Sequence, residues 1–278
     1  MKKIIALLLA VAMLLCFAAC AQEPKETATE ENKGAANTEV KTEEKTEEKT
    51  EIKTVKEGKL IMGTNAYFQP YEYYEGDKII GIDAEIAAKI AEKLGLELEI
   101  QDMAFDSIIT AVNEGSVDMG LAGMTVNEDR LKDVDFSISY ASGVQAIVVP
   151  ENSPIKSVDD LCADGAAYKV GTQLGTTGDI YSTDDFGDEL VTSFTTGNEA
   201  INALLGGDVD CVIIDNEPAK AFVKNNAGLK VLETSYADED YAACIKKGND
   251  ALRAAIDEAI EELIEDGTVE SIIDKYIK

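Results

Sequence analysis

The sequence predicts an α/β protein made of two similar lobes, with a ligand held in a cleft between them. The main observation is an internal similarity between residues 111–122, AVNEGSVDMGLA, and residues 203–214, ALLGGDVDCVII. In both segments a glycine typical of a helix end precedes Val-Asp and a short apolar run, which indicates a buried strand. Polar groups follow both predicted strands, so each lobe would present one polar strand end to the cleft.

The first of these strand ends carries groups suited to a carboxylate. The predicted strand Val117–Ala122 is followed by Gly123 and Thr125, and Asn127 is a candidate N-cap for a helix that has Arg130 in its first turn. A hydroxyl, free N–H groups at a helix start and a planar guanidinium all favour a pair of carboxylate oxygens.

The second strand end carries Asp215, in the segment VIIDNEP. A carboxylate there would complement Arg130 by receiving an ammonium group, so the two lobes together would hold a molecule with both charges. Simpler interpretations also remain open. Arg130 could pair on the surface with Glu128 or Asp133, and Asp215 could merely cap a helix over residues 216–224.

Composition excludes several classes of function. The formal net charge of the 278 residues is −29, mostly on residues 58–278, which argues against nucleic acid and anionic lipid as partners. The absence of His removes Ser-His catalysis and His-ligated metal sites, and we expect no metal or cofactor. Cys211 and Cys244 are expected to be buried in strands, and a disulfide between Cys162 and Cys211 is left open.

The N-terminus is typical of a targeting segment. Lys2 and Lys3 precede the apolar run 4–19, which is short for a membrane span and ends in FAAC at residues 17–20. This ending resembles a bacterial lipobox, which implies removal of residues 1–19 and lipid attachment to Cys20; an ordinary signal peptide is the alternative. Residues 20–56 are rich in Glu, Lys and Thr, and are predicted to be a disordered tether.

The remaining chain alternates predicted strands and helices. Apolar residues recur every four positions over 81–94 and end at Gly95, which predicts an amphipathic helix. Asp106 is a candidate N-cap for a helix ending near Gly115. Further strands are predicted at 59–64, 96–101, 170–172, 209–214 and 229–232, and further helices at 249–265 and at the C-terminus.

Several of these segments, in fixed order, resemble the family 3 extracytoplasmic solute-binding proteins, which serve ABC importers of polar amino acids. They are the helix at 81–94, the aromatic-Pro-aromatic loop that precedes it, AGMTVNEDR at 122–130 and DFS at 135–137. The resemblance covers nearly all of residues 57–278. Ala84 departs from the family pattern, which prefers a larger aliphatic residue, and this affects packing only.

The resemblance implies a two-lobed periplasmic-binding-protein fold of type II. Lobe 1 would comprise residues 57–140 plus 242–278, and lobe 2 residues 141–241, with the hinge strands at its ends. Crossover strands are expected near 141–144 and 237–241.

The resemblance also implies the roles of individual site residues. Arg130, Thr125 and Gly123 would hold a carboxylate, and Asp215 an ammonium group. The remaining roles would be a sandwich around the ligand side chain by Phe68 and Phe105, closure over the carboxylate by the amides of Gly175, Thr176 and Thr177, and side-chain selectivity from Asn65 and Gln173. Phe68 and Phe105 could also be plain core residues. The segment GTQLGTTGD at 171–179 lacks the GK[ST] ending of a phosphate loop.

We therefore expect a lipid-anchored, extracytoplasmic, monomeric binding protein that delivers an L-α-amino acid to a permease with its ATPase. The expected ligand side chain is polar and uncharged. Asn65 and Gln173 carry no charge, and the resemblance implies an Asp in place of Asn65 for basic ligands. Glu72 and Asp106 are acids nearby in sequence, but Asp106 is expected to cap its helix. A dehydratase-type enzyme of the same fold and an amino-acid sensor or adhesin are the alternatives.

Overall fold

The computed structural model describes residues 52–233 and 236–277. The expected signal segment, Cys20 and most of the expected tether lie outside these residues. Among the helices of the described part, none combines the length and the apolar character needed to span a lipid bilayer.

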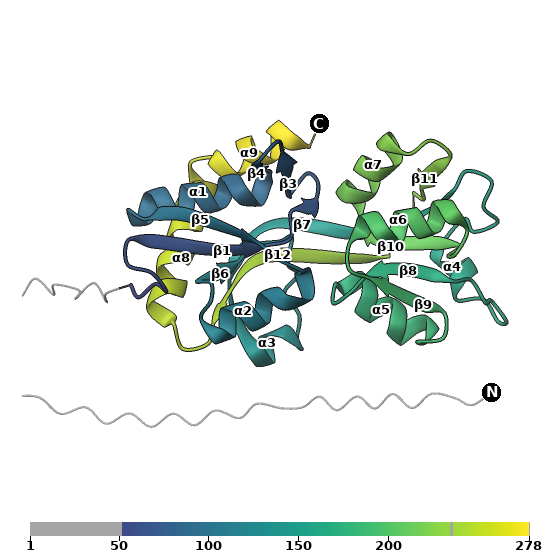
Figure 1. The fold of residues 1–278 in the computed structure, drawn as a ribbon, viewed down its shortest axis with the longest axis horizontal. Helices are drawn as coiled ribbons and strands as arrows, with labels where there is room; N and C mark the ends of the chain where they lie inside the picture. The colour runs from purple at the N-terminus through teal and green to yellow at the C-terminus, as the bar shows by residue number, and fades with distance from the viewer. Residues whose placement is uncertain (1–51, 234–235, 278) are drawn as a thin grey trace, which may run out of the picture. The chain divides into compact units, whose positions relative to one another are not determined.

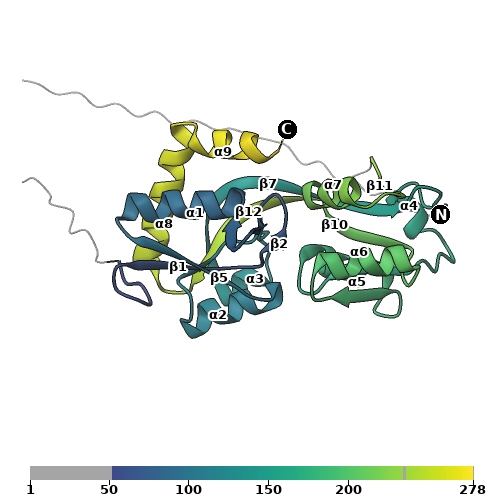
Figure 2. The ribbon, with the colours of Figure 1, turned by 45° about the horizontal axis from the view of Figure 1, so that its top comes forward.

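Within the described residues a nine-stranded sheet extends through both lobes, in the order β5-β1-β6-β12-β7-β10-β8-β9, with β11 paired to β7. The strands β7 (Val134–Pro150) and β12 (Ala237–Lys246) are antiparallel and pass together from one lobe to the other (Figures 1 and 2). Ala141 lies opposite Tyr241, and Val144 opposite Asp238. The expected two-lobed α/β fold with two crossover strands is therefore confirmed.

The first lobe is built on parallel strands that flank the β12–β7 pair. The strand and helix bounds are β1 (Lys59–Thr64), β5 (Glu97–Asp102), β6 (Met119–Gly120), α1 (Ile82–Leu94), α2 (Ile108–Glu114), α3 (Arg130–Asp133), α8 (Asp250–Glu265) and α9 (Thr268–Tyr276). A small separate sheet consists of β2 (Tyr67–Phe68), β3 (Glu72–Glu75) and β4 (Lys78–Ile80). Helix α1 buries Ile82, Ile86 and Ile90 and ends at Gly95 with φ 69°, as its periodicity predicts.

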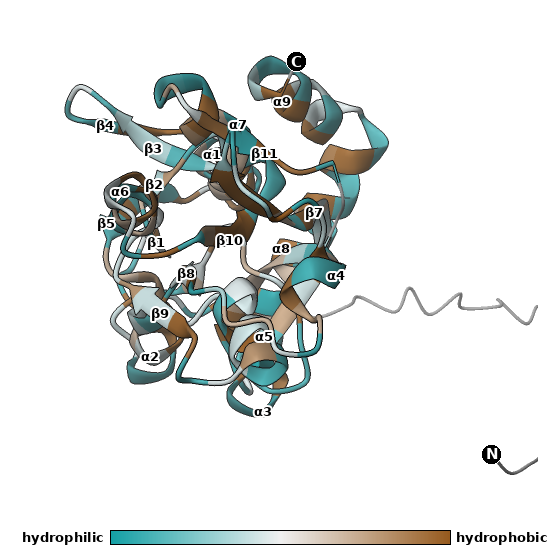
Figure 3. Cartoon of the chain, turned by 90° about the vertical axis from the view of Figure 1, so that its right-hand side faces the viewer, coloured by the Kyte–Doolittle hydropathy of each residue, from teal (hydrophilic) through white to brown (hydrophobic). Residues whose placement is uncertain are grey.

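The second lobe repeats the parallel arrangement with β8 (Val170–Gln173), β9 (Val191–Phe194) and β10 (Cys211–Asp215). It also contains α4 (Val158–Leu161), α5 (Thr177–Phe186), α6 (Gly197–Gly206), α7 (Asn216–Asn225) and β11 (Leu229–Val231). Every residue of β10 is buried, and Figure 3 shows this strand as an apolar centre of the lobe. A continuous apolar run is expected for a strand covered on both faces.

The two similar segments make the same pair of hydrogen bonds, one pair in each lobe. Asp118 donates its N–H to the carbonyl of Ile61 (2.8 Å) and accepts the Ile61 N–H at Oδ2 (2.7 Å). Asp210 makes the same two bonds with Lys169, at 2.8 and 2.7 Å. In each lobe the aspartate of Val-Asp therefore attaches its own strand to the neighbouring parallel strand.

Two local predictions need correction. The strand expected over Val117–Ala122 is shorter, with β6 limited to Met119–Gly120. The N–H of Leu121 still donates to the carbonyl of Gly63 at 3.1 Å, and the chain turns away at Gly123, whose φ is 52°. Asp106 does not cap a helix; it lies inside a 3₁₀ turn, Phe105–Ser107, and α2 follows without a side-chain cap.

The three described cysteines are free thiols. Cys211 and Cys244 are buried as expected, and Cys162 is exposed.

Candidate functional site

A small cavity, with about 290 Å³ of atom-free space that is partly open to solvent, lies where the two lobes meet. Both lobes contribute to its wall. All of the sequence-predicted ligand-binding residues except Gly175 line it, together with two residues that were not predicted, Glu72 and Ala122. The full lining is Asn65, Phe68, Glu72, Phe105, Ala122, Gly123, Thr125, Arg130, Gln173, Thr176, Thr177 and Asp215.

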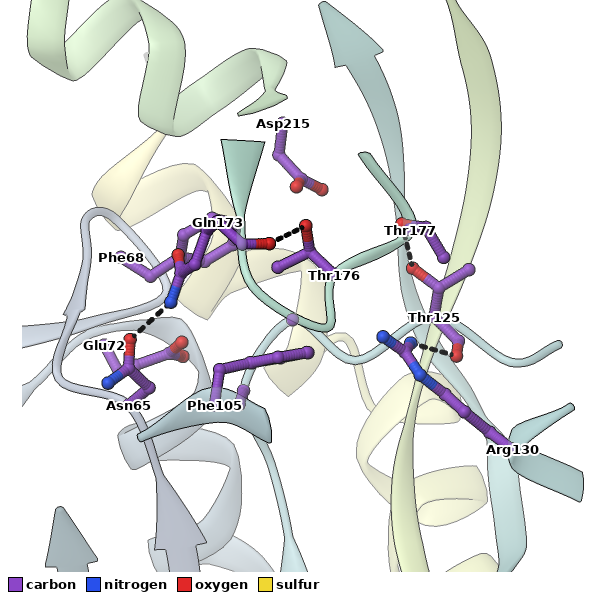
Figure 4. A pocket seen from close by; sticks show the side chains of 12 residues that line it. Asn65, Phe68, Glu72, Phe105, Thr125, Arg130, Gln173, Thr176, Thr177 and Asp215 are labelled. Carbon is purple, nitrogen blue, oxygen red and sulfur yellow. Dashed lines mark hydrogen bonds between the residues drawn. The ribbon is translucent and has the colours of Figure 1, made fainter. Parts of the chain in front are cut away.

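Arg130 occupies one end of this cavity (Figure 4). It is the first residue of α3 and only 6% exposed, and its N–H donates to Oδ1 of Asn127 at 2.8 Å. The guanidinium donates to the carbonyl of Thr125 (2.7 Å) and, across the cleft, to that of Gly175 (3.0 Å). A surface ion pair is therefore not the role of Arg130. Three of its five N–H donors remain for a ligand, since no other bond of this group is found among the described residues.

The turn between β8 and α5 faces Arg130 from the second lobe. Its shape is held by Asp179, which accepts the Thr172 hydroxyl (2.6 Å) and the Gly175 N–H (3.0 Å). The Thr176 N–H donates to the carbonyl of Gln173 at 3.2 Å. Two of the three amides expected to close over a carboxylate are thus used within the turn. The Thr177 N–H, at the start of α5, finds no acceptor in the described part of the chain.

Asp215 ends β10 and stands at the N-cap position of α7, but its side chain makes no capping hydrogen bond. Oδ2 accepts the Nε2 amide of Gln145 at 2.8 Å, and Oδ1 has no partner among the described residues. Burial, and then the charge of Glu239, raise the pKa of Asp215 well above its usual value. A cationic ligand atom would therefore stabilise the ionised form of Asp215. Helix capping does not explain the buried position of this side chain.

The other end of the cavity carries Asn65, Gln173 and Glu72 (Figure 4). Gln173 Nε2 donates to Oδ1 of Asn65 at 2.9 Å, a second direct bond between the lobes, and Asn65 donates to the carbonyl of Met103 at 2.8 Å. In the view of Figure 4, Phe105 lies between this end and Arg130. Its ring also lies 5.3 Å from the Arg130 guanidinium carbon.

Glu72 is the lining residue that matters most among those the sequence analysis missed. It is fully buried at the start of β3, and neither carboxylate oxygen has a partner within the described residues. Burial, and then the charge of Asp83, raise its pKa well above its usual value. The local signal was its position directly after the aromatic-Pro-aromatic loop. The segment EYYE does not alternate between polar and apolar residues, so it does not predict that Glu72 is buried.

Asp83 supports this part of the wall from α1. Its Oδ2 accepts the N–H of Gly123 (2.7 Å) and the hydroxyl of Tyr140 (2.8 Å), which links the first strand end to the helix and to β7. Burial raises the pKa of Asp83 to about 6. Gly123 has φ 52°, and a Cβ there would come within 2.9 Å of the Phe68 ring, so this position favours glycine.

The electrostatic balance of the site is strongly negative. Arg130 is the one buried cation among the described residues, whereas Asp215 and Glu72 line the same cavity as acids. A zwitterion would pair Arg130 with its carboxylate and Asp215 with its ammonium, and would leave Glu72 without a counter-charge. The described residues hold no cluster of three or more His, Cys, Asp or Glu placed to bind a metal.

Two lobes joined by paired crossover strands, with a cavity of opposite charges between them, define a solute-binding protein. Comparison with known proteins gives the family. Residues 60–278 match the family described as bacterial extracellular solute-binding proteins, family 3. The chain belongs to this family, and the resemblance found in its motifs is confirmed.

The arginine-binding extracellular protein ArtP of Bacillus subtilis is 34% identical over 227 residues, which are 78% of this chain and 86% of that protein. A solved structure of an ancestral arginine-binding protein bound to arginine is 40% identical, with a TM-score of 0.74 and coverage of 80% of this chain and 99% of that one. A second structure, of an ancestral arginine-binding protein bound to glutamine, is 39% identical, with a TM-score of 0.74 and coverage of 79% and 98%.

Proposed function

We propose that this protein binds an L-α-amino acid between its lobes and presents it to the permease of an ABC importer. The observation that carries the proposal is the presence of Arg130 and Asp215, buried and opposite in charge, in the wall of one cavity. A buried zwitterion loses hydration at both charges, and such a pair compensates for the loss. Thr125 and the Thr177 N–H would complete the carboxylate site, with Gly123 beside them.

We further propose that the ligand side chain is cationic, as in arginine. The earlier expectation of an uncharged side chain rested on the neutral residues Asn65 and Gln173 and did not place Glu72 in the site. Glu72 supplies such an acid, with two unpartnered oxygens at that end of the cavity. A guanidinium can donate to both oxygens of one carboxylate, and Phe68 and Phe105 would cover its apolar stem. The relatives named for arginine support this choice.

A polar, uncharged side chain such as that of glutamine is the second candidate. It is favoured by the raised pKa of Glu72, since a protonated carboxyl can donate a hydrogen bond to an amide oxygen. A similar binding protein has been solved with glutamine. The two candidates differ in whether the ligand neutralises Glu72.

We also propose how the protein is anchored, how its lobes are divided and how the permease recognises it. We place the lipid anchor at Cys20, the tether at residues 20–56, and the lobes at 57–140 plus 242–278 and at 141–241. Ligand binding would favour the closed arrangement of the lobes, which the permease would recognise in the monomeric protein. We propose a binding role without catalysis, because the cavity has one cation, whereas a dehydratase acting on a dicarboxylic acid would need two.

A thermal-shift panel of the L-amino acids on the purified protein tests the proposal. A ligand at 1,000 times its dissociation constant should stabilise the protein by about 4 kcal/mol. For a protein of this size that corresponds to a rise in Tm of roughly 8–16 °C. We expect L-arginine to give the largest shift. If no amino acid raises the Tm, the proposed zwitterion site is wrong.

The side-chain assignment has its own test, which compares L-arginine with its uncharged analogue L-citrulline by titration calorimetry. Glu72→Gln should weaken L-arginine at least about tenfold while changing L-citrulline little, because one charged hydrogen-bonding pair is lost. Glu75→Gln, an exposed change on the same strand, is the matched control. Equal losses for both ligands would contradict a cationic subsite at Glu72.

A further inference from the structure

Three buried polar side chains meet where the crossover strands enter the second lobe. Gln145 on β7, Asp215 on β10 and Glu239 on β12 are each at most 5% exposed. The sheet register explains their meeting, because Asp215 lies directly opposite Gln145, and Glu239 lies opposite Gly143, two residues away on the same face. Gln145 and Glu239 do not line the ligand cavity, so no role has yet been given to them.

One amide group connects the two acids. Gln145 Nε2 lies 2.8 Å from Oδ2 of Asp215 and 2.8 Å from Oε2 of Glu239. An amide nitrogen has two hydrogens, so these bonds use both. The second oxygen of each carboxyl group has no partner among the described residues. Two carboxylates held this close and this deeply cannot both be ionised at low cost.

The neighbouring charged groups do not offset the cost of ionising both carboxylates. Arg130 and Tyr181 face Glu239 from α3 and α5, and Tyr71 and Glu72 face Asp215 from the first lobe. Arg130 is the one cation in this group, and its guanidinium already donates to two backbone carbonyls. A ligand carboxylate would neutralise Arg130 further. A further positive charge near Asp215 and Glu239 is therefore required if both carboxylates are to be ionised.

We infer that Asp215, held beside Glu239 by the Gln145 amide, carries one proton in the ligand-free protein, and that the α-ammonium of the bound amino acid replaces it. This inference rests on the proposed function. The carboxyl proton leaves to solvent, and the ammonium keeps its three protons while its charge takes the place of the lost one. Gln145 and Glu239 act as positioning residues, since they reach the ligand through Asp215. The raised pKa of Asp215 agrees with this arrangement.

The consequence is that binding releases a proton. The pKa of Asp215 is raised in the free protein and the ligand lowers it, so affinity rises with pH until Asp215 is ionised without ligand. Below the pKa of Asp215 in the ligand-free protein, the dissociation constant should fall about tenfold for each unit by which the pH is raised. Above it the dissociation constant should become independent of pH.

Calorimetric titration with L-citrulline at pH 6–7, in buffers of different ionisation enthalpy, measures the released proton directly. This probe keeps the α-ammonium and has no side-chain charge, so it does not disturb Glu72. We expect the slope of binding enthalpy against buffer enthalpy to correspond to about one proton released. Glu239→Gln should reduce the release, because the charge of Glu239 no longer raises the pKa of Asp215 while its burial remains, whereas Glu72→Gln should retain it.

The outcomes separate this inference from the proposed function. Absence of any amino-acid binding in the thermal-shift panel overturns both. Binding of L-citrulline or L-arginine with no buffer dependence at pH 6–7 overturns the Asp215 proton alone, as does equal release by wild type and Glu239→Gln. The wild-type measurement alone shows whether binding releases a proton, so the inference can be tested even if Glu239→Gln does not fold.

Discussion

The guanidinium of Arg130 donates a 3.0 Å hydrogen bond to the carbonyl of Gly175, from the first lobe to the second. The same group donates to the carbonyl of Thr125 within its own lobe. Arg130 therefore both joins the two lobes and lines the cavity. A ligand carboxylate bound by its remaining donors would strengthen the same junction, which couples binding to lobe closure.

Arg130→Lys should reduce the affinity for L-amino acids by about a hundredfold. Lysine keeps the charge but loses the planar fork that can hold a carboxylate and two carbonyls together. Titration calorimetry measures the change. Arg253→Lys on the exposed face of α8 is the control, because its ion pair with Asp250 is on the surface and should contribute little. Unchanged affinity in Arg130→Lys would remove Arg130 from the carboxylate site.

Gln173→Ala should favour an open arrangement of the lobes in the ligand-free protein. It removes the 2.9 Å bond to Asn65, which crosses the cleft at the end away from Arg130. Small-angle X-ray scattering should give a larger radius of gyration for the free variant than for wild type. Saturating ligand should restore the wild-type value. The neighbouring exposed change Leu174→Ala is the control and should leave both values unchanged.

Asp83→Asn should stabilise the protein at neutral pH. Asp83 has a folded-state pKa of about 6, above the usual value of an unfolded aspartate, so its contribution to stability is complete at about pH 4 and is lost as the pH rises through 6. Asparagine can accept the same bonds from Gly123 and Tyr140, and it is neutral, so it removes the cost of a buried negative charge.

Thermal unfolding at pH 4 and pH 8 tests this expectation. The variant should gain roughly 1–3 kcal/mol over wild type at pH 8 and little at pH 4. Asp77→Asn in the exposed turn between β3 and β4 is the control. A loss of stability of similar size at both pH values would mean that the hydrogen bonds of the carboxylate outweigh the cost of burying its charge.

Gly178→Ala should weaken ligand binding without contacting the ligand. A Cβ at this position of α5 would lie 2.7 Å from Oε1 of Gln145, so the amide that holds Asp215 must move. Calorimetry should show reduced affinity for L-arginine and L-citrulline alike. Gly206→Ala in α6 is the control, because the nearest atom to its Cβ is a side-chain oxygen at 3.6 Å. Equal affinity in wild type and Gly178→Ala would mean that the position of Gln145 does not matter.

The elements most accurately predicted from the sequence are those with strong periodicity. Helix α8 buries Leu252, Ile256, Ala259 and Leu263 on the expected face, and α1 ends at the expected glycine. The short strand β6 and the turn at Asp106 were less well predicted. In both places the chain turns, at Gly123 and over Phe105–Ser107, and the pattern of a short segment does not give the exact bounds of an element.

The sequence by itself determined the two-lobed fold, the family and most of the cavity wall, because these depend on local patterns and on motifs that stay at fixed spacing. Asp215 is the last residue of β10 and Arg130 begins the helix that follows β6, so their places near strand ends were visible in the sequence. Tertiary structure alone decided that Glu72 faces inward beside Asp83, and that Gln145 joins Asp215 to Glu239. Those contacts join residues far apart in the chain. Burial then changes the charges that such groups can carry, which sequence spacing does not encode.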